Sequence, residues 1–284
     1  MRAEQWSGVV THHGEGPGWD PCAGRLRVVD QIAGDLVTFA GDGTVAERRH
    51  VGDVLAAWRP RSAGGLVVAV ERGFAVLAPD GAVTAGPELW RDPTVRMNDG
   101  ACGPDGAFYC GSMAYDARPG AADVHRLAPD GTTSVVHTGA TISNGLVWAA
   151  DGAFAYYVDT ATGCVAKVTV EPSTGRFDAV APWVTIAAHH GAPDGIALDA
   201  EGGVWVALWG GSAVHRYTAD GRLDAVVEVN ARQVTACAFG GADGSTLYVT
   251  TSRQGLPDDQ DPAAGAVFTV RPGVTGRPLL PYAG

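Results

Sequence analysis

Residues 144–152 read Asn-Gly-Leu-Val-Trp-Ala-Ala-Asp-Gly, which is a polar residue, a short apolar run and a turn that ends in glycine. Residues 98–106 and 194–202 follow the same plan, again with eight positions between the polar residue and the final glycine. Asp-Gly and related pairs tolerate the positive φ that a tight hairpin turn requires. Each copy therefore predicts a β-strand followed by a turn into the next strand.

Three further copies, which begin at residues 15, 57 and 235, complete the series. The six first residues, called leaders below, lie 41 to 50 residues apart, which is the length of a four-stranded propeller blade. A second set of glycine turns supplies the later hairpin of most units. The sequence thus predicts an all-β fold, a six-bladed β-propeller with four antiparallel strands per blade, as one domain over residues 1–284. Residues 1–14 are expected to add a strand that closes the ring against the last unit.

Composition excludes several classes of function. The net charge is −11, and no cluster of Lys and Arg could neutralise a row of phosphates, so nucleic acid is not an expected partner. No apolar run approaches eighteen residues and the start lacks a signal-like segment, so we expect no membrane contact and a cytoplasmic location. The five cysteines form no Cys-x-x-Cys pair, which indicates reduced thiols. A monomer or a weak homo-oligomer is expected.

The leaders of a propeller should converge on its axis. Glu15, Asn144 and Asp194 then bring oxygen donors from three distant blades to one place, as a hard divalent cation requires. Asn and Asp before Gly are also ordinary turn formers. These leaders, however, precede a strand in units that already have their own glycine turns, and this favours a metal site.

Six short motifs resemble the SMP-30/gluconolactonase family, which includes regucalcin-like (LRE-like) proteins. They cover nearly the whole chain in order, at 14–19 (Gly-Glu-Gly-Pro-Gly-Trp), 96–100 (Arg-Met-Asn-Asp-Gly), 111–113 (Gly-Ser-Met), 143–146 (Ser-Asn-Gly-Leu), 193–195 (Pro-Asp-Gly) and 239–241 (Phe-Gly-Gly). Each motif alone is weakly specific, and together they are highly specific. Gly103 departs from the family pattern, which usually has Asp there, and we interpret this as a turn variation.

The resemblance implies roles for individual residues. Glu15, Asn144 and Asp194 would hold one divalent metal ion, with Ca²⁺ or Zn²⁺ favoured and Mg²⁺, Mn²⁺ or Fe²⁺ as alternatives. Arg96 and Asn98 would contact substrate hydroxyls. Asp116 is the nearest match to an acidic substrate contact found in some members, although Ser112 replaces the family's Thr and Tyr115 stands before it.

The implied activity is hydrolysis of a sugar lactone, such as a gluconolactone-like aldonolactone, to the aldonic acid in carbohydrate metabolism. The metal would polarise the carbonyl and Asp194 would act as general base. Two alternatives stay open: a metal-dependent phosphotriesterase or esterase, and a non-catalytic calcium-binding propeller. The variable loops at 113–122 and 253–265 leave the exact sugar undetermined.

Other candidate groups have simpler interpretations. Ser212 lacks the Gly-x-Ser-x-Gly context of a serine nucleophile. The pairs His12-His13 and His189-His190 precede Glu15 and Asp194, and we interpret them as polar loop residues near the channel mouth, with extra ligands or proton shuttles as the alternative. Tryptophans at strand positions are expected to pack between blades; they include Trp19, Trp148 and Trp205.

Overall fold

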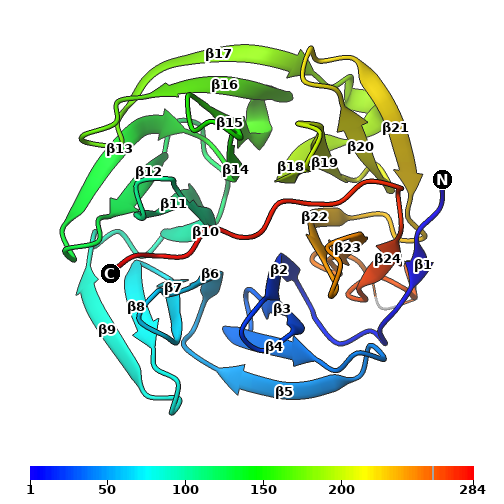
Figure 1. The fold of residues 1–284 in the computed structure, drawn as a ribbon, viewed down its shortest axis with the longest axis horizontal. Coiled ribbons are helices and arrows are strands. Elements are labelled where there is room, and N and C mark those ends of the chain that lie inside the picture. The colour runs from blue at the N-terminus through cyan, green and yellow to red at the C-terminus, as the bar shows by residue number, and fades with distance from the viewer. Residues whose placement is uncertain (258) are drawn as a thin grey trace.

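The computed structural model describes residues 1–257 and 259–284, and its strands form six four-stranded antiparallel sheets around one axis (Figure 1). This confirms the predicted six-bladed propeller. The first strand of each blade lies nearest the axis and the next strands follow outward (Figure 1). The leaders, which begin these inner strands or lie near their start, are therefore grouped around the centre of the molecule.

Five blades are continuous in sequence. Blade one contains β2 (Gly14–Asp20), β3 (Arg25–Asp30), β4 (Asp35–Phe39) and β5 (Val45–His50). Blade two contains β6 (Leu55–Pro60), β7 (Leu66–Val70), β8 (Gly73–Leu77) and β9 (Val83–Glu88). Blade three contains β10 (Val95–Cys102), β11 (Phe108–Ala114), β12 (Ala122–Leu127) and β13 (Thr133–Ala140). Blade four contains β14 (Ser143–Trp148), β15 (Ala155–Asp159), β16 (Cys164–Val170) and β17 (Phe177–Thr185). Blade five contains β18 (Ala192–Leu198), β19 (Val204–Trp209), β20 (Ala213–Tyr217) and β21 (Leu223–Glu228).

The sixth blade joins the two ends of the chain. Its strands β22 (Val234–Gly240), β23 (Thr246–Thr251) and β24 (Phe268–Val270) are completed by β1 (Glu4–Gln5). Glu4 pairs with Thr269 in an antiparallel register. The expected N-terminal closing strand is thus present, and it removes an open sheet edge from the last blade.

Predicted turn and packing residues behave as their chemistry requires. Gly106 and Gly202, the final glycines of two repeats, have φ of 73° and 82°, which residues with a Cβ rarely adopt. The three tryptophans each contact an aromatic ring of a neighbouring blade, in the pairs Trp19–Tyr248, Trp148–Tyr109 and Trp205–Phe239. Aromatic packing therefore contributes to the contacts between neighbouring blades.

The pairing of the two inner strands shifts register at the leader position in every blade. The shifts fall at Glu15/Gly18, Leu55/Ala57, Met97/Gly100, Ser143/Leu146, Pro193/Ile196 and Val234/Ala236. In blade two the unpaired residue is Ala56, one position before the predicted leader Ala57. Such irregularities release a strand from its ladder and redirect side chains. The shifts leave the leaders of blades three to six unpaired, whereas Glu15 pairs with Val29 immediately before its shift.

Residues 271–284, called the C-terminal strap below, run across the central opening from blade six toward blades two and three (Figure 1). Backbone hydrogen bonds anchor the strap at both ends, from Arg277 N to Leu198 O (3.2 Å) and from Tyr282 N to Pro60 O (2.8 Å). Tyr282 is buried, and its hydroxyl donates to Ala128 O (2.8 Å). The strap therefore covers one mouth of the channel.

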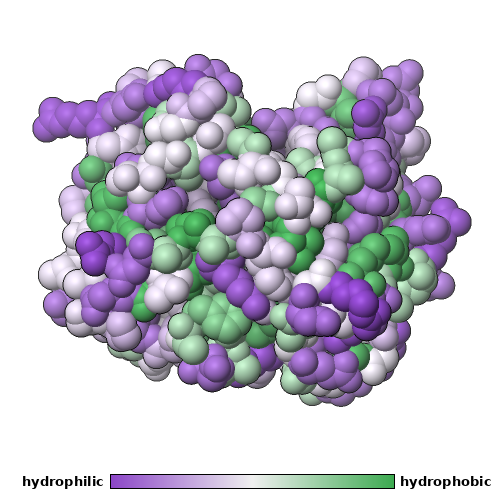
Figure 2. Space-filling view, turned by 90° about the horizontal axis from the view of Figure 1, so that it is seen from above, coloured by the Kyte–Doolittle hydropathy of each residue, from purple (hydrophilic) through white to green (hydrophobic). Residues whose placement is uncertain are grey.

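Hydrophilic residues cover much of the side of the ring, with hydrophobic ones interspersed (Figure 2). The helical elements of the described residues are two three-residue 3₁₀ turns, η1 (Thr160–Thr162) and η2 (Ala188–His190), and neither has the length or apolarity to span a bilayer. All five cysteines are free thiols, as predicted.

Candidate functional site

Three oxygen-bearing side chains lie at the leader positions of blades one, four and five. Glu15, Asn144 and Asp194 are 5%, 5% and 4% exposed. Asn144 Oδ1 and Asp194 Oδ1 are fully buried, and within the part of the chain that the structure describes neither has a hydrogen-bond partner. Buried polar atoms are nearly always paired in folded proteins. Two unpaired acceptors at this level of the channel are what a cation site without its ion would show.

The electrostatics of the centre also call for positive charge. Burial, followed by the charge of Asp194, raises the pKa of Glu15 well above its usual range. Burial, followed by the charge of Asp99, raises the pKa of Asp194 in the same way. Carboxylates that are removed from water and placed near one another favour a bound cation, because it supplies the charge that solvent no longer does. The residues present therefore fit a hard divalent ion.

The donor set is a mixed one. Among residues 1–257 and 259–284, no group of three or more His, Cys, Asp or Glu is placed to hold a metal. The centre depends instead on an amide, since Asn144 stands with the two carboxylates, and oxygen ligands of this kind suit Ca²⁺ better than a thiolate or imidazole cluster would. The Asn144 amide nitrogen donates to Thr160 Oγ1 (3.1 Å), which orients its oxygen.

Arg96 and Asn98 form a fixed polar wall beside this centre. Both side chains are buried, and Arg96 Nη1 donates to Asn98 Oδ1 (2.9 Å). Asn98 in turn donates to the Ser143 carbonyl (3.0 Å), which joins blade three to blade four next to Asn144. Burial lowers the pKa of Arg96 to about 10, so the guanidinium remains a cation at neutral pH. Its Nε atom is buried and has no partner within the described residues, which leaves a donor available.

The structure places Asp116 away from this wall. Its side chain is about two-thirds exposed and accepts from the Arg118 guanidinium (3.2 Å). The neighbouring Tyr115 is the residue that contacts Arg96, whose guanidinium carbon lies 5.7 Å from the ring centroid. Tyr115 also donates to Glu71 Oε1 (2.8 Å). The only signal for Tyr115 in the sequence was its position immediately before Asp116.

The four singled-out histidines divide into two groups. His12, His189 and His190 are exposed, as expected of polar loop residues. His13 is 5% exposed, and its Nε2 lies 4.0 Å from Glu15 Oε1. Burial, followed by the charge of Arg96, lowers the pKa of His13 to about 3, so the ring is neutral. His13 lies outside the named strands, in an isolated bridge with Ser252, but unlike the other three it is buried beside Glu15.

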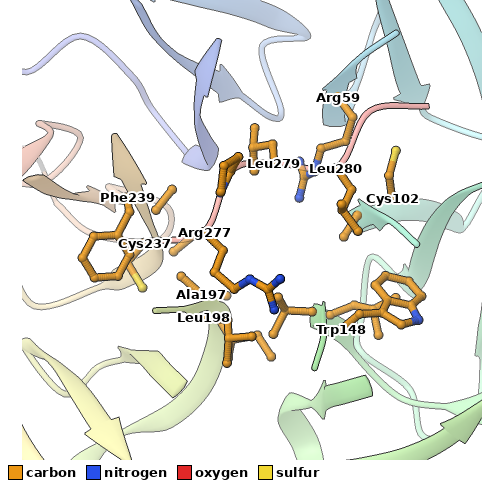
Figure 3. A pocket seen from close by; sticks show the side chains of 18 of the residues that line it. Arg59, Cys102, Trp148, Ala197, Leu198, Cys237, Phe239, Arg277, Leu279 and Leu280 are labelled. Atoms are coloured by element: carbon orange, nitrogen blue, oxygen red, sulfur yellow. The ribbon is translucent and has the colours of Figure 1, made fainter. Parts of the chain in front are cut away.

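A cavity of about 380 Å³ occupies the half of the channel under the C-terminal strap. Its walls include Gly16 and Gly195, the residues that directly follow Glu15 and Asp194. Arg59 and Arg277 extend into it, together with leucines of the strap (Figure 3). The candidate centre thus has a strap-covered cavity on one side, and a substrate would approach from the other.

Comparison with known proteins identifies the family of this propeller. The profile of the SMP-30/Gluconolactonase/LRE-like region matches residues 13–253. The chain belongs to this family. Pentonolactonase XacC of Haloferax volcanii is 33% identical over 272 residues, which is 93% of this chain and 92% of the relative. Regucalcin of Danio rerio is 31% identical over 279 residues, 95% of each chain.

Among solved structures, a calcium-binding protein, regucalcin from Agrobacterium tumefaciens, superimposes with a TM-score of 0.92 at 29% identity. The match covers 100% of this chain and 99% of that one. The family match confirms the resemblance that the motifs indicated, and the structural match extends over the whole chain, including the strap.

Proposed function

We propose that the protein hydrolyses a sugar lactone to its aldonic acid, with one divalent cation held by Glu15, Asn144 and Asp194. The observation that carries this proposal is the pair of buried, unpartnered oxygens Asn144 Oδ1 and Asp194 Oδ1 on the channel axis. The lactonase named among the relatives supports the reaction class. A sugar lactone is also the small, hydroxyl-rich molecule that a buried polar wall would recognise.

A bound divalent cation supplies positive charge that polarises a carbonyl and stabilises the oxyanion formed when water adds to it. The chain's own residues do the rest. Asp194 accepts the proton of the attacking water through its carboxylate. Arg96 and Asn98, already fixed by their mutual hydrogen bond, orient the sugar hydroxyls, which turns a loose encounter into an aligned one.

Calcium binding without turnover is the second candidate, because the regucalcin relative is described as a calcium-binding protein. Arg96 argues for a substrate, since a cation store has no use for a buried guanidinium with a free donor next to its ion. A metal-dependent phosphotriesterase or esterase would use the same donors with a different substrate.

The test is a pH-indicator assay over a panel of aldonolactones, simple esters and a phosphotriester. Protein stripped with a chelator is assayed before and after each cation is restored. We expect acid release from aldonolactones only with a cation, and little from Asp194→Asn at normal metal content. Cation-independent turnover, or an unimpaired Asp194→Asn variant, would falsify the proposal, and a preference for the phosphotriester would support the esterase alternative.

A further inference from the structure

His13 lies on the wall of the channel directly beside the candidate metal centre. It lies one residue before β2, in an isolated antiparallel bridge with Ser252, and precedes Glu15 by two residues. His13 Nε2 lies 4.0 Å from Glu15 Oε1.

The ring of His13 is held in one orientation from its other side. Its Nδ1 hydrogen-bonds to Ser252 Oγ (2.7 Å), and Ser252 Oγ itself accepts from Gln254 N (3.0 Å). The backbone amides of His12 and His13 both donate to the Asp30 carboxylate (3.0 Å each). The indole of Trp209 stands at the ring's edge, with centroids 6.0 Å apart. This second layer fixes the residue as supporting contacts fix a binding group.

The structure gives Nε2 no hydrogen bond to any described residue, and Glu15 Oε1 lies 4.0 Å from it. A histidine needed only for packing would have no reason to present a polar atom there. A hydroxyl group both donates and accepts, so it can pair with Nε2 in either tautomer of the ring.

We propose that His13 is a specificity-determining residue whose Nε2 hydrogen-bonds a ring hydroxyl of the lactone, so that the site selects polyhydroxylated lactones over unsubstituted ones. This inference rests on the proposed function. An unsubstituted lactone places a methylene opposite Nε2 and leaves the nitrogen unpaired when water is displaced. Loss of one such contact corresponds to roughly a 10- to 100-fold change in kcat/KM.

The test compares D-glucono-δ-lactone with δ-valerolactone, which has the same ring without the hydroxyls. We expect His13→Phe to lower kcat/KM for the first by roughly 10- to 100-fold and to leave the second within about 3-fold. His13→Gln, which retains a polar group, should recover part of the loss. His190→Phe is the matched control, because His190 is exposed on η2. It should leave kcat/KM unchanged for both lactones.

A binding measurement separates this inference from the proposed function. Calorimetric titration of the metal-loaded protein with D-gluconate and with 5-hydroxypentanoate, the two ring-opened acids, needs no turnover. We expect wild type to prefer D-gluconate and His13→Phe to lose that preference at unchanged metal content. If wild type hydrolyses neither lactone, the proposed function fails while this comparison still decides the role of His13. The role of His13 would be overturned if His13→Phe lost affinity equally for both acids, lost affinity for neither, or released the metal.

Discussion

Two aspartates five residues apart in blade five should respond in opposite ways to the same substitution. The carboxylate of Asp199 is fully buried: Oδ1 accepts from Glu201 N (2.9 Å) and Gly203 N (2.7 Å), and Oδ2 accepts from Trp205 Nε1 (2.9 Å) and Arg216 Nε (2.7 Å). The carboxylate of Asp194 is equally buried, but its Oδ1 accepts from no group in the described chain. One carboxylate is compensated within the fold, and the other is not.

The magnitudes follow from this difference. In Asp199→Asn the amide nitrogen must face two N–H donors whichever way it is turned, and Arg216 loses one of its three carboxylate partners but keeps Glu201 and Asp224. Buried donors left unsatisfied in this way destabilise by about 1–3 kcal/mol. Asp194→Asn removes a buried charge whose Oδ1 has no hydrogen-bond partner, so the metal-free protein should be unchanged or more stable by up to about 2 kcal/mol.

Urea unfolding at pH 7.5, followed by tryptophan fluorescence, measures both effects in chelator and in excess cation. A cation at about 100 times its Kd should stabilise wild type by about 2.7 kcal/mol and have little effect on Asp194→Asn. The reasoning is refuted if Asp194→Asn lowers the stability of the chelator-treated protein by about 3 kcal/mol or more, because Asp194 would then be part of the structural network.

Further predictions concern a buried histidine, a lysine among aromatic rings and the glycine that follows Asp194. His125 stacks on Trp90 with ring centroids 4.7 Å apart, and burial lowers its pKa to about 4. The unfolded chain binds the proton more readily than the folded protein does. The free energy of unfolding should therefore be unaffected above about pH 6.5 and fall by up to about 3 kcal/mol toward pH 4. His125→Phe should reduce this acid loss in urea midpoints at pH 7.5 and 4.5, and an identical loss in both proteins would contradict the assignment. Lys167 Nζ lies 5.0 to 5.7 Å from the ring centroids of Phe154, Tyr156 and Trp183. In thermal unfolding, Lys167→Met should destabilise the protein by about 1–2 kcal/mol, whereas Lys167→Arg should retain most of the stability. Equal losses in the two variants would rule out a cation–π contribution. A Cβ at Gly195 would meet Ala236 Cβ at 2.5 Å, whereas a Cβ at Gly41 would meet nothing within 4 Å. Gly195→Ala should therefore lower the free energy of unfolding by about 1–3 kcal/mol and weaken cation binding, and Gly41→Ala should do neither. Chemical unfolding and calorimetric titration measure the two effects.

The sequence predicted those features that local chemistry repeats. Five blades carry a polar leader, blade two has Ala57 instead, and each repeat ends in its own glycine turn, so six copies of one signal specified the blade number and placed Glu15, Asn144 and Asp194 at equivalent positions. Arg96 and Asn98 followed from a motif of adjacent residues, and the structure joins them directly.

Features that depend on distant partners were not predictable. The burial of His13 depends on Ser252, which is 239 residues away in the sequence. The strap contacts blades two, three, five and six through one or two backbone hydrogen bonds each, which leave no periodic pattern in the sequence. The direction of Asp116 is decided by Arg118 on the same loop, and a motif match carries no information about that pairing.

Calorimetric titration of one cation into chelator-stripped protein tests most directly whether residues of three separate blades hold it together. We expect one site in wild type and at least a tenfold loss of affinity in each of Glu15→Gln, Asn144→Ala and Asp194→Asn. Wild-type protein that binds no cation, or a variant of any of the three that binds as tightly as wild type, would contradict the account.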